Sequence, residues 1–188
     1  MKMISDMVPK RRATMVGVLI ILAYSMLIYP LTQNKALGFV TDILSGLAVI
    51  GIPLLLFPLF QTPNNRTLNY LYLISRLGEG MLMIAGGFLL LISSLEPWRD
   101  RIYSDIHIYF FISGAIFFYI LLYRTKVVPE FISVWGLVAA LLLLIITILR
   151  LFGINSTLLD VLLAPMILNE LFLAIWLMIR GFKSPSSP

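Results

Sequence analysis

The sequence contains no cysteine, a single histidine and few charged residues. The absence of cysteine excludes a disulfide framework, a thiolate nucleophile and a Cys-ligated metal site. With His107 as the one histidine, a hydrolase that holds zinc through several histidines is excluded as well. Every lysine lies in a predicted loop or terminus, which excludes a retinal-type Schiff base inside the protein. We therefore expect no metal and no cofactor, and we assign no catalytic residue.

Hydrophobic residues are abundant: they make up 60% of the 188 residues, against 12% that are charged. A soluble domain of this size has too much surface to accommodate such a composition. The composition therefore predicts an integral membrane protein with the lipid bilayer as its partner. The net charge of +5 falls mainly in short loops and termini. That pattern is typical of membrane orientation and argues against nucleic-acid binding.

Apolar runs divide the chain into six segments, each near the roughly 20 residues that a bilayer core requires. Charges and turn residues separate them. The predicted spans cover residues 13–31, 36–60, 68–95, 102–123, 131–149 and 158–179. The predicted fold class is therefore all-α, with a single membrane domain over residues 1–188 built as a six-helix transmembrane bundle.

Lysine and arginine are distributed unequally between the two sides of this predicted bundle. The more basic side contains Lys2, Lys10, Arg11, Arg12, Arg66, Arg124, Lys126, Arg180 and Lys183. The opposite side contains Lys35, Arg99, Arg101 and Arg150. The positive-inside rule then predicts that both termini are cytoplasmic.

A charged pair interrupts the third predicted span. Arg76 and Glu79 are three residues apart, so they lie on one face of a helix. A charge in hydrocarbon costs roughly 2.5–3.5 kcal/mol on insertion scales, so this face must turn towards protein or water. Asn169 and Glu170 fall at a similar depth, near the middle of the sixth span. We predict that these four residues form one central polar layer.

The charges of this layer do not balance. Arg76 stays protonated and can neutralise only one of Glu79 and Glu170. The surplus carboxylate must be protonated, be solvated by internal water or hold a cation. Glu79 already has Arg76 at i−3, whereas the sixth span offers Glu170 no basic neighbour one turn away. Glu170 is therefore the predicted proton- or ligand-responsive residue.

Four further ionisable residues fall in the outer half or at the outer rim of the predicted bundle: Asp42, His107, Arg150 and Asp160. They could form a second polar layer or a vestibule. A lone histidine is more often packed or interfacial than a metal ligand, so His107 predicts no metal site.

The segment Leu121–Gly136, with Tyr-Arg-Thr-Lys-Val-Val-Pro leading into Ser-Val-Trp-Gly, resembles a signature of a prokaryotic family of multi-pass membrane proteins catalogued as a domain of unknown function. Members also share an Arg-x-x-Glu span and an ending like Asn169–Phe182. This chain departs from the pattern at Thr125, where Ser is commoner, and at Glu130, where a basic residue is commoner. The resemblance implies a bacterial or archaeal plasma membrane. It implies no substrate and no catalytic residue.

Three functions remain compatible with these observations. The favoured one is binding or transport of a small ligand at the central layer, which could be an ion, a proton or an amphipathic organic molecule. The second is a non-catalytic interaction protein whose buried ion pairs only fix the helix register. The third is a lipid-modifying intramembrane enzyme that uses Glu79 or Glu170 as acid or base. An open cavity reaching Glu170 favours the first, a dry core the second, and a lateral opening beside a carboxylate the third. The oligomeric state stays open.

Overall fold

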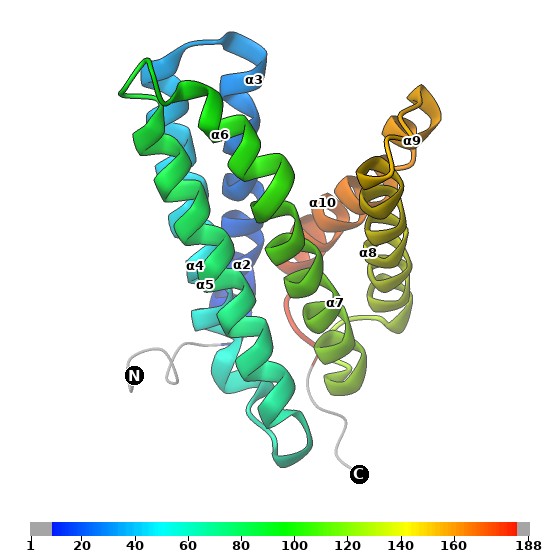
Figure 1. Cartoon of the computed structure of the whole chain (residues 1–188). Coiled ribbons are helices and arrows are strands. Elements are labelled where there is room, and N and C mark those ends of the chain that lie inside the picture. The colour runs from blue at the N-terminus through cyan, green and yellow to red at the C-terminus, as the bar shows by residue number, and fades with distance from the viewer. Residues whose placement is uncertain (1–8, 184–188) are drawn as a thin grey trace.

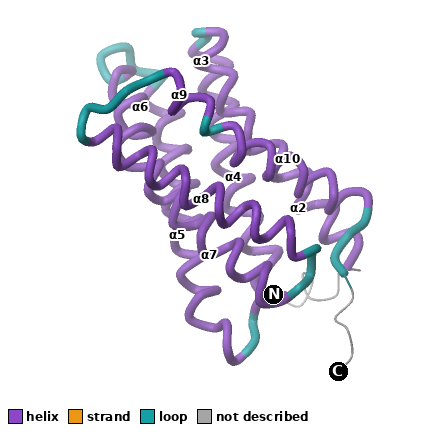
Figure 2. Tube along the Cα trace, turned by 90° about the vertical axis from the view of Figure 1, so that its right-hand side faces the viewer, coloured by secondary structure: helices purple, strands orange, loops and turns teal. Residues whose placement is uncertain are grey.

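The computed structural model describes residues 9–183, so Lys2 and the tail from Ser184 onward lie outside the described residues. Within this range the chain consists of helices joined by short turns, with no strand (Figure 1, Figure 2). The elements in order are α2 (Pro9–Ala23), η1 (Tyr24–Leu27), α3 (Ile28–Thr32), α4 (Lys35–Phe60), η2 (Pro63–Asn65), α5 (Arg66–Leu89), α6 (Glu96–Ile102), η3 (Tyr103–His107), α7 (Ile108–Thr125), α8 (Glu130–Leu151), α9 (Thr157–Val161) and α10 (Ala164–Ile179).

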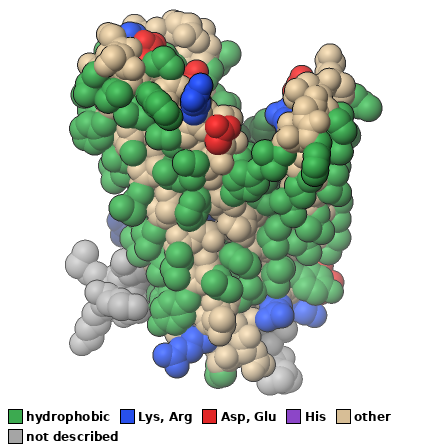
Figure 3. Space-filling view, viewed as in Figure 1, with side chains coloured by type: hydrophobic (Ala, Val, Ile, Leu, Met, Phe, Trp, Pro, Cys, Tyr) green, Lys and Arg blue, Asp and Glu red, His purple; other side chains and the backbone are tan. Residues whose placement is uncertain are grey.

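The six long helices pack as a ring. In ring order, α2 contacts α4, α4 contacts α5, α5 contacts α7, α7 contacts α8, α8 contacts α10, and α10 returns to α2. Figure 1 shows that α4 and α5 diverge from α8 towards the end that carries α6 and α9, which we call the α9 end. The space-filling view is hollowed between the two halves at that end (Figure 3). The opposite end, which carries the start of α2 and the end of α10, we call the terminal end.

Five helical segments among residues 9–183 are long and apolar enough to cross a membrane: Lys10–Thr32, Lys35–Phe60, Glu96–Thr125, Glu130–Leu151 and Thr157–Ile179. This confirms the all-α, membrane-type fold. Helix α5 is not among the five, because Arg66, Arg76 and Glu79 lower its hydropathy. The sixth span and the cytoplasmic placement of the termini therefore stay predictions.

Turn chemistry explains where several helices begin and end. The Asn34 side chain accepts a hydrogen bond from the Leu37 amide and caps the start of α4. The sixth predicted span is interrupted between α9 and α10. Pro165 lies in the first turn of α10, where its missing N–H removes no helical hydrogen bond. The break thus precedes the proline, and no kink within a continuous helix is needed.

Two glycines hold α4 and α5 in direct backbone contact. A Cβ added to Gly46 would lie 2.6 Å from the carbonyl oxygen of Gly80, and a Cβ on Gly80 would lie 2.7 Å from that of Gly46. No side chain fits between the helices at this point. Because Gly80 follows Glu79 directly, this contact fixes the depth and rotation at which the charged pair enters the bundle.

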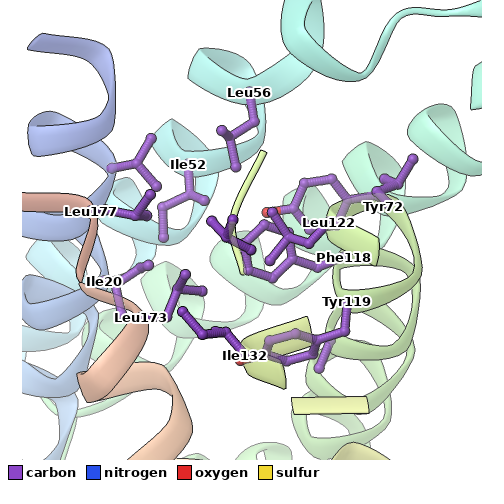
Figure 4. Close-up of a cluster of buried hydrophobic side chains, with 14 of the residues drawn as sticks. Ile20, Ile52, Leu56, Tyr72, Phe118, Tyr119, Leu122, Ile132, Leu173 and Leu177 are labelled. Carbon is purple, nitrogen blue, oxygen red and sulfur yellow. The ribbon is translucent and has the colours of Figure 1, made fainter. Parts of the chain in front are cut away.

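An apolar core fills the ring towards the terminal end (Figure 4). It draws on all six long helices, with Tyr72 from α5 and the other residues from α2, α4, α7, α8, α10 and the turn between α7 and α8. At its centre the rings of Tyr72 and Phe118 stack with centroids 5.3 Å apart. Phe60 packs against both, at 6.2 Å from Tyr72 and 6.3 Å from Phe118. The ring of helices is therefore closed by aromatic packing at this end.

Candidate functional site

A cavity of about 310 Å³ lies inside the ring of helices, next to the apolar core. All six long helices contribute to its wall, which is predominantly apolar. The polar or ionisable side chains in the wall are Tyr24, Tyr72, Arg76, Glu79, Tyr103, His107 and Glu170. A concave, mainly apolar space with a few converging polar groups is the usual form of a small-molecule site.

Arg76 is the positive charge at the centre of this cavity. Its Nη1 donates to Glu79 Oε2 at 2.8 Å, and its Nη2 lies 3.9 Å from Glu170 Oε1. The guanidinium also lies 5.4 Å from the centroid of the Phe111 ring. Arg76 is 6% exposed, Glu79 is 2% exposed and Glu170 is 9% exposed. The structure thus brings Arg76, Glu79 and Glu170 together, with a close pair and one looser partner.

Glu170 is the looser partner, and its second contact comes from a residue that the sequence analysis did not identify. The Tyr24 hydroxyl donates to Glu170 Oε2 at 2.7 Å across the interface of η1 and α10. Oε1 has only the longer contact with Arg76. The one sequence signal for Tyr24 is its position in mid-span, away from the membrane interfaces where tyrosine is usual.

His107 belongs to this central cavity, which corrects its predicted place in an outer layer. Its Nε2 lies 3.8 Å from Glu79 Oε1, and the side chain is 4% exposed. The physical reason is the π-helical turn η3, which the sequence pattern did not predict. Such turns are frequent at functional sites. Within residues 9–183, Nε2 has no hydrogen-bond partner.

Asn169 lies apart from the cavity, although the sequence placed it beside Glu170 in the central layer. Its Nδ2 donates to the backbone carbonyl of Ile132 at 3.0 Å, and the residue is fully buried. Consecutive residues on a helix point about a quarter-turn apart, so Asn169 faces α8 while Glu170 faces the cavity. Asn169 ties α10 to α8.

Asp42 forms a second buried ion pair, with Arg99 of α6. Arg99 Nε and Nη2 donate to the two carboxylate oxygens of Asp42 at 2.7 and 2.9 Å. The guanidinium lies between the rings of Tyr29 and Tyr103, 4.5 Å from each centroid. The sequence analysis treated Arg99 as a loop residue and missed this pair, because its partner is 57 positions away in the chain.

The predicted outer layer is therefore not one cluster. Asp42 pairs with Arg99, His107 faces Glu79, and Arg150 pairs with Asp160 at the exposed rim between α8 and α9. The reason is that these residues come from helices on different sides of the ring. Among residues 9–183, no group of three or more His, Cys, Asp or Glu side chains is arranged to hold a metal ion.

A second cavity of about 300 Å³ adjoins the first towards the α9 end. Its wall includes the polar residues Ser104, Asp105, Tyr109, Thr147 and Arg150. The two cavities share Tyr103, Ile108, Leu143 and Leu163 as lining residues. A polar rim at the α9 end thus borders the central cavity near the π-helical turn. Of the predicted outer residues, Arg150 lines this rim.

Fold and site together define a helical membrane-type protein with a charged internal cavity. The model of a family described as a domain of unknown function, DUF4386, matches residues 99–181. This match confirms the predicted resemblance to a family catalogued as a domain of unknown function. The matched residues include His107 and Glu170, whereas Arg76 and Glu79 lie before them. Comparison with curated proteins and with solved structures finds no match.

Proposed function

We propose that this protein binds a small ligand, ion or proton in the central cavity and carries it across a prokaryotic plasma membrane. The observation that supports this proposal is a cavity that reaches Arg76, Glu79 and Glu170 inside an otherwise apolar bundle. Polar groups are expensive at this depth and are usually kept for a task. A purely structural network would have no need of the empty volume beside it.

The shape of the cavity supports a transport cycle. The stacked Tyr72 and Phe118 close the bundle towards the terminal end. Towards the α9 end the adjoining polar cavity provides a path to the surface. A site that is open to one side and sealed from the other corresponds to one half of an alternating-access cycle.

We also propose that α5 crosses the membrane as a sixth span and that both termini are cytoplasmic. Helix α5 has 24 residues, about 36 Å at ~1.5 Å per residue, which exceeds a hydrocarbon core of about 30 Å. It packs against both α4 and α7, so its charged face is turned away from lipid.

The absence of natural cysteine makes single-cysteine labelling a clean test of this topology. Asn64 and Asn155 are matched positions: both are exposed asparagines in turns, at opposite ends of the bundle. We expect a membrane-impermeant thiol reagent added to intact cells to label Asn155→Cys and to spare Asn64→Cys. The reverse labelling pattern would overturn the orientation.

The same approach tests the functional proposal. Ala23 lines the central cavity, whereas Ala140 is fully buried in the packed core. We expect Ala23→Cys to react with a small impermeant thiol reagent from the α9 side and Ala140→Cys to stay unreactive. If both cysteines are equally inert, the centre is a dry packed core. The polar network is then structural, and the binding function is wrong.

One observation favours a second candidate, an intramembrane enzyme acting on lipid. The cavity-lining residues Leu27 of η1 and Ile167 of α10 are 42% and 39% exposed, so the cavity has an apolar edge on the lipid-facing surface. Glu170 lies one turn from Ile167 and could serve as an acid or base. Incubation of the purified protein with lipid vesicles, followed by mass spectrometry of the lipids, distinguishes the enzyme from the binding or transport protein. We expect intact lipids, and a lipid product that depends on Glu170 would favour the enzyme.

A further inference from the structure

Resting on the proposed binding function, we infer that the ligand is an amphipathic organic cation. Its protonated amine would pair with Glu170, and its apolar body would fill the central cavity. Three properties of the cavity point to this class of ligand: its net charge, the composition of its wall and the hydrogen-bonding state of Glu170.

The first property is charge. The wall residues that count as formally charged are Arg76, Glu79 and Glu170, with His107 counted as neutral. Arg76 makes its close contact with Glu79, at 2.8 Å, and reaches Glu170 only at 3.9 Å. By formal charge, one carboxylate is therefore surplus, and Glu170 is the one with the weaker ionic partner. A ligand that carries a single positive charge completes the balance, whereas a carboxylate or phosphate ligand adds a second surplus negative charge.

The second property is the composition of the wall. Apart from the polar group at its centre, the lining consists of aliphatic, methionine and phenylalanine side chains from all six long helices. A proton or a bare metal ion would leave most of the volume of about 310 Å³ without a partner. An organic body removes that apolar surface from water, and the stabilisation grows with the buried area. The wall therefore selects a cation that carries a hydrocarbon portion.

The third property is the state of Glu170 itself. The hydroxyl of Tyr24 holds Oε2 at 2.7 Å and so orients the carboxylate. Oε1 accepts no hydrogen bond within the described residues and lies 3.9 Å from Arg76 Nη2, so it can accept from an ammonium group. Four further polar atoms of wall residues have no hydrogen-bond partner within residues 9–183: Arg76 Nε, His107 Nε2 and the hydroxyls of Tyr72 and Tyr103. Of these, His107 Nε2 and the two hydroxyls provide additional polar contacts for a bound ligand.

Three probes with one apolar body and different head groups test this inference. They are 1-aminoadamantane, which is cationic at neutral pH, 1-adamantanol, which is neutral, and adamantane-1-carboxylate, which is anionic. Binding is measured by titration calorimetry and by thermal unfolding on the full chain in a neutral detergent. We expect the amine to bind saturably and at least about tenfold more tightly than the alcohol, because a charge-assisted hydrogen bond is added. We expect the carboxylate to bind more weakly than the alcohol.

Glu170→Gln should abolish the preference for the amine while leaving binding of the alcohol unchanged. Glu130→Gln is the matched control: the same chemical change, at an exposed carboxylate far from the cavity, should leave the preference intact. If Glu170→Gln does not fold, the ranking of the three probes on the unmodified chain still decides the question. Equal binding of amine and alcohol, or a preference that survives in Glu170→Gln, would overturn the inference.

The two proposals fail in different ways. If Ala23→Cys is labelled but the amine shows no advantage, the cavity is a binding site for another class of ligand and only the cation inference falls. If Ala23→Cys is inert, the binding function itself falls.

Discussion

The bundle contains two buried arginine–carboxylate sites that differ in whether a second buried carboxylate faces the arginine. Arg99 has one buried partner, Asp42, and its contact with Asp100 Oδ1 at 3.1 Å involves a side chain that is 76% exposed. Arg99 and Asp42 form a two-point pair enclosed by the rings of Tyr29 and Tyr103. Arg76 faces two carboxylates, holds one of them closely, and borders a cavity. The closed pair has what a structural ion pair needs, namely good geometry and no space around it. The open site keeps one close contact, between Arg76 and Glu79 at 2.8 Å, but it holds Glu170 only at 3.9 Å and borders a cavity, which is why we propose it as the functional site.

The largest expected effect comes from breaking the closed pair. Arg99→Leu leaves the Asp42 carboxylate buried without a partner, and we expect the free energy of unfolding to fall by about 3–5 kcal/mol. Denaturant titration in detergent measures it. The double variant Arg99→Leu with Asp42→Leu should recover a large part of the loss, since no buried charge remains. A single variant that is no less stable than the double would contradict the structural assignment of this pair.

Breaking the open site should lower the free energy of unfolding by a smaller amount. Arg76→Leu removes the same type of side chain, but the cavity gives water or a cation access to Glu79 and Glu170. We expect a loss of about 1–3 kcal/mol, measured in the same titration. The double variant Arg76→Leu with Glu79→Leu should be more stable than the single one. If Arg76→Leu is as damaging as Arg99→Leu, the two sites are equally closed and the comparison fails.

A smaller effect is expected from the hydroxyl that orients the surplus carboxylate. Tyr24→Phe keeps the ring and removes the donor to Glu170 Oε2. We expect a loss of about 1.5 kcal/mol in the free energy of unfolding, because the acceptor is charged. The matched control is Tyr70→Phe, since Tyr70 is 41% exposed rather than buried against a carboxylate. If both variants lose the same free energy of unfolding, the hydrogen bond from Tyr24 contributes nothing specific to the site.

The smallest effect on stability is expected at Glu170 itself. Glu170→Gln removes the surplus charge and keeps an oxygen that can accept from Tyr24, so stability should change by less than about 1 kcal/mol. Asp42→Asn makes the same kind of change in the pair with Arg99. It should lower the free energy of unfolding clearly more than Glu170→Gln does, because Arg99 then loses its buried counter-charge. Thermal unfolding of the two variants side by side measures this contrast. Comparable losses would mean that Glu170 is part of a balanced network.

The structure corrected the sequence analysis where a prediction depended on which helices are neighbours. The sequence analysis placed Asp42, His107, Arg150 and Asp160 in the outer half or at the outer rim of the bundle, because depth can be estimated from the rise per residue. Depth says nothing about position around the ring. The four residues accordingly fall into separate surroundings, with Asp42 against Arg99 and His107 against Glu79. Asn169, adjacent to Glu170 in sequence, faces another helix.

Contacts between distant spans were equally hidden from sequence patterns. Tyr24 and Glu170 are 146 positions apart, and nothing in the local sequence of either one specifies the other. The π-helical turn at Tyr103–His107 was missed for a related reason. A π-turn adds one residue to a helix without a distinctive composition, and here it rotates His107 into the cavity.

The sequence by itself determined that this chain is helical, that its helices are of a kind that crosses membranes, and that a charged pair lies inside one of them. Span length, hydropathy and the three-residue spacing of Arg76 and Glu79 are local properties that can be read from the sequence. They constrain the fold because an unsatisfied polar group in hydrocarbon raises the free energy by several kcal/mol. The i−3 spacing of Arg76 from Glu79 also pointed to Glu170 as the surplus carboxylate, but only the tertiary structure gave the distances, 2.8 Å from Arg76 to Glu79 within α5 and 3.9 Å from Arg76 to Glu170 of α10. The tertiary structure also decided that an empty space lies beside that carboxylate, since a cavity arises from the packing of all six helices together.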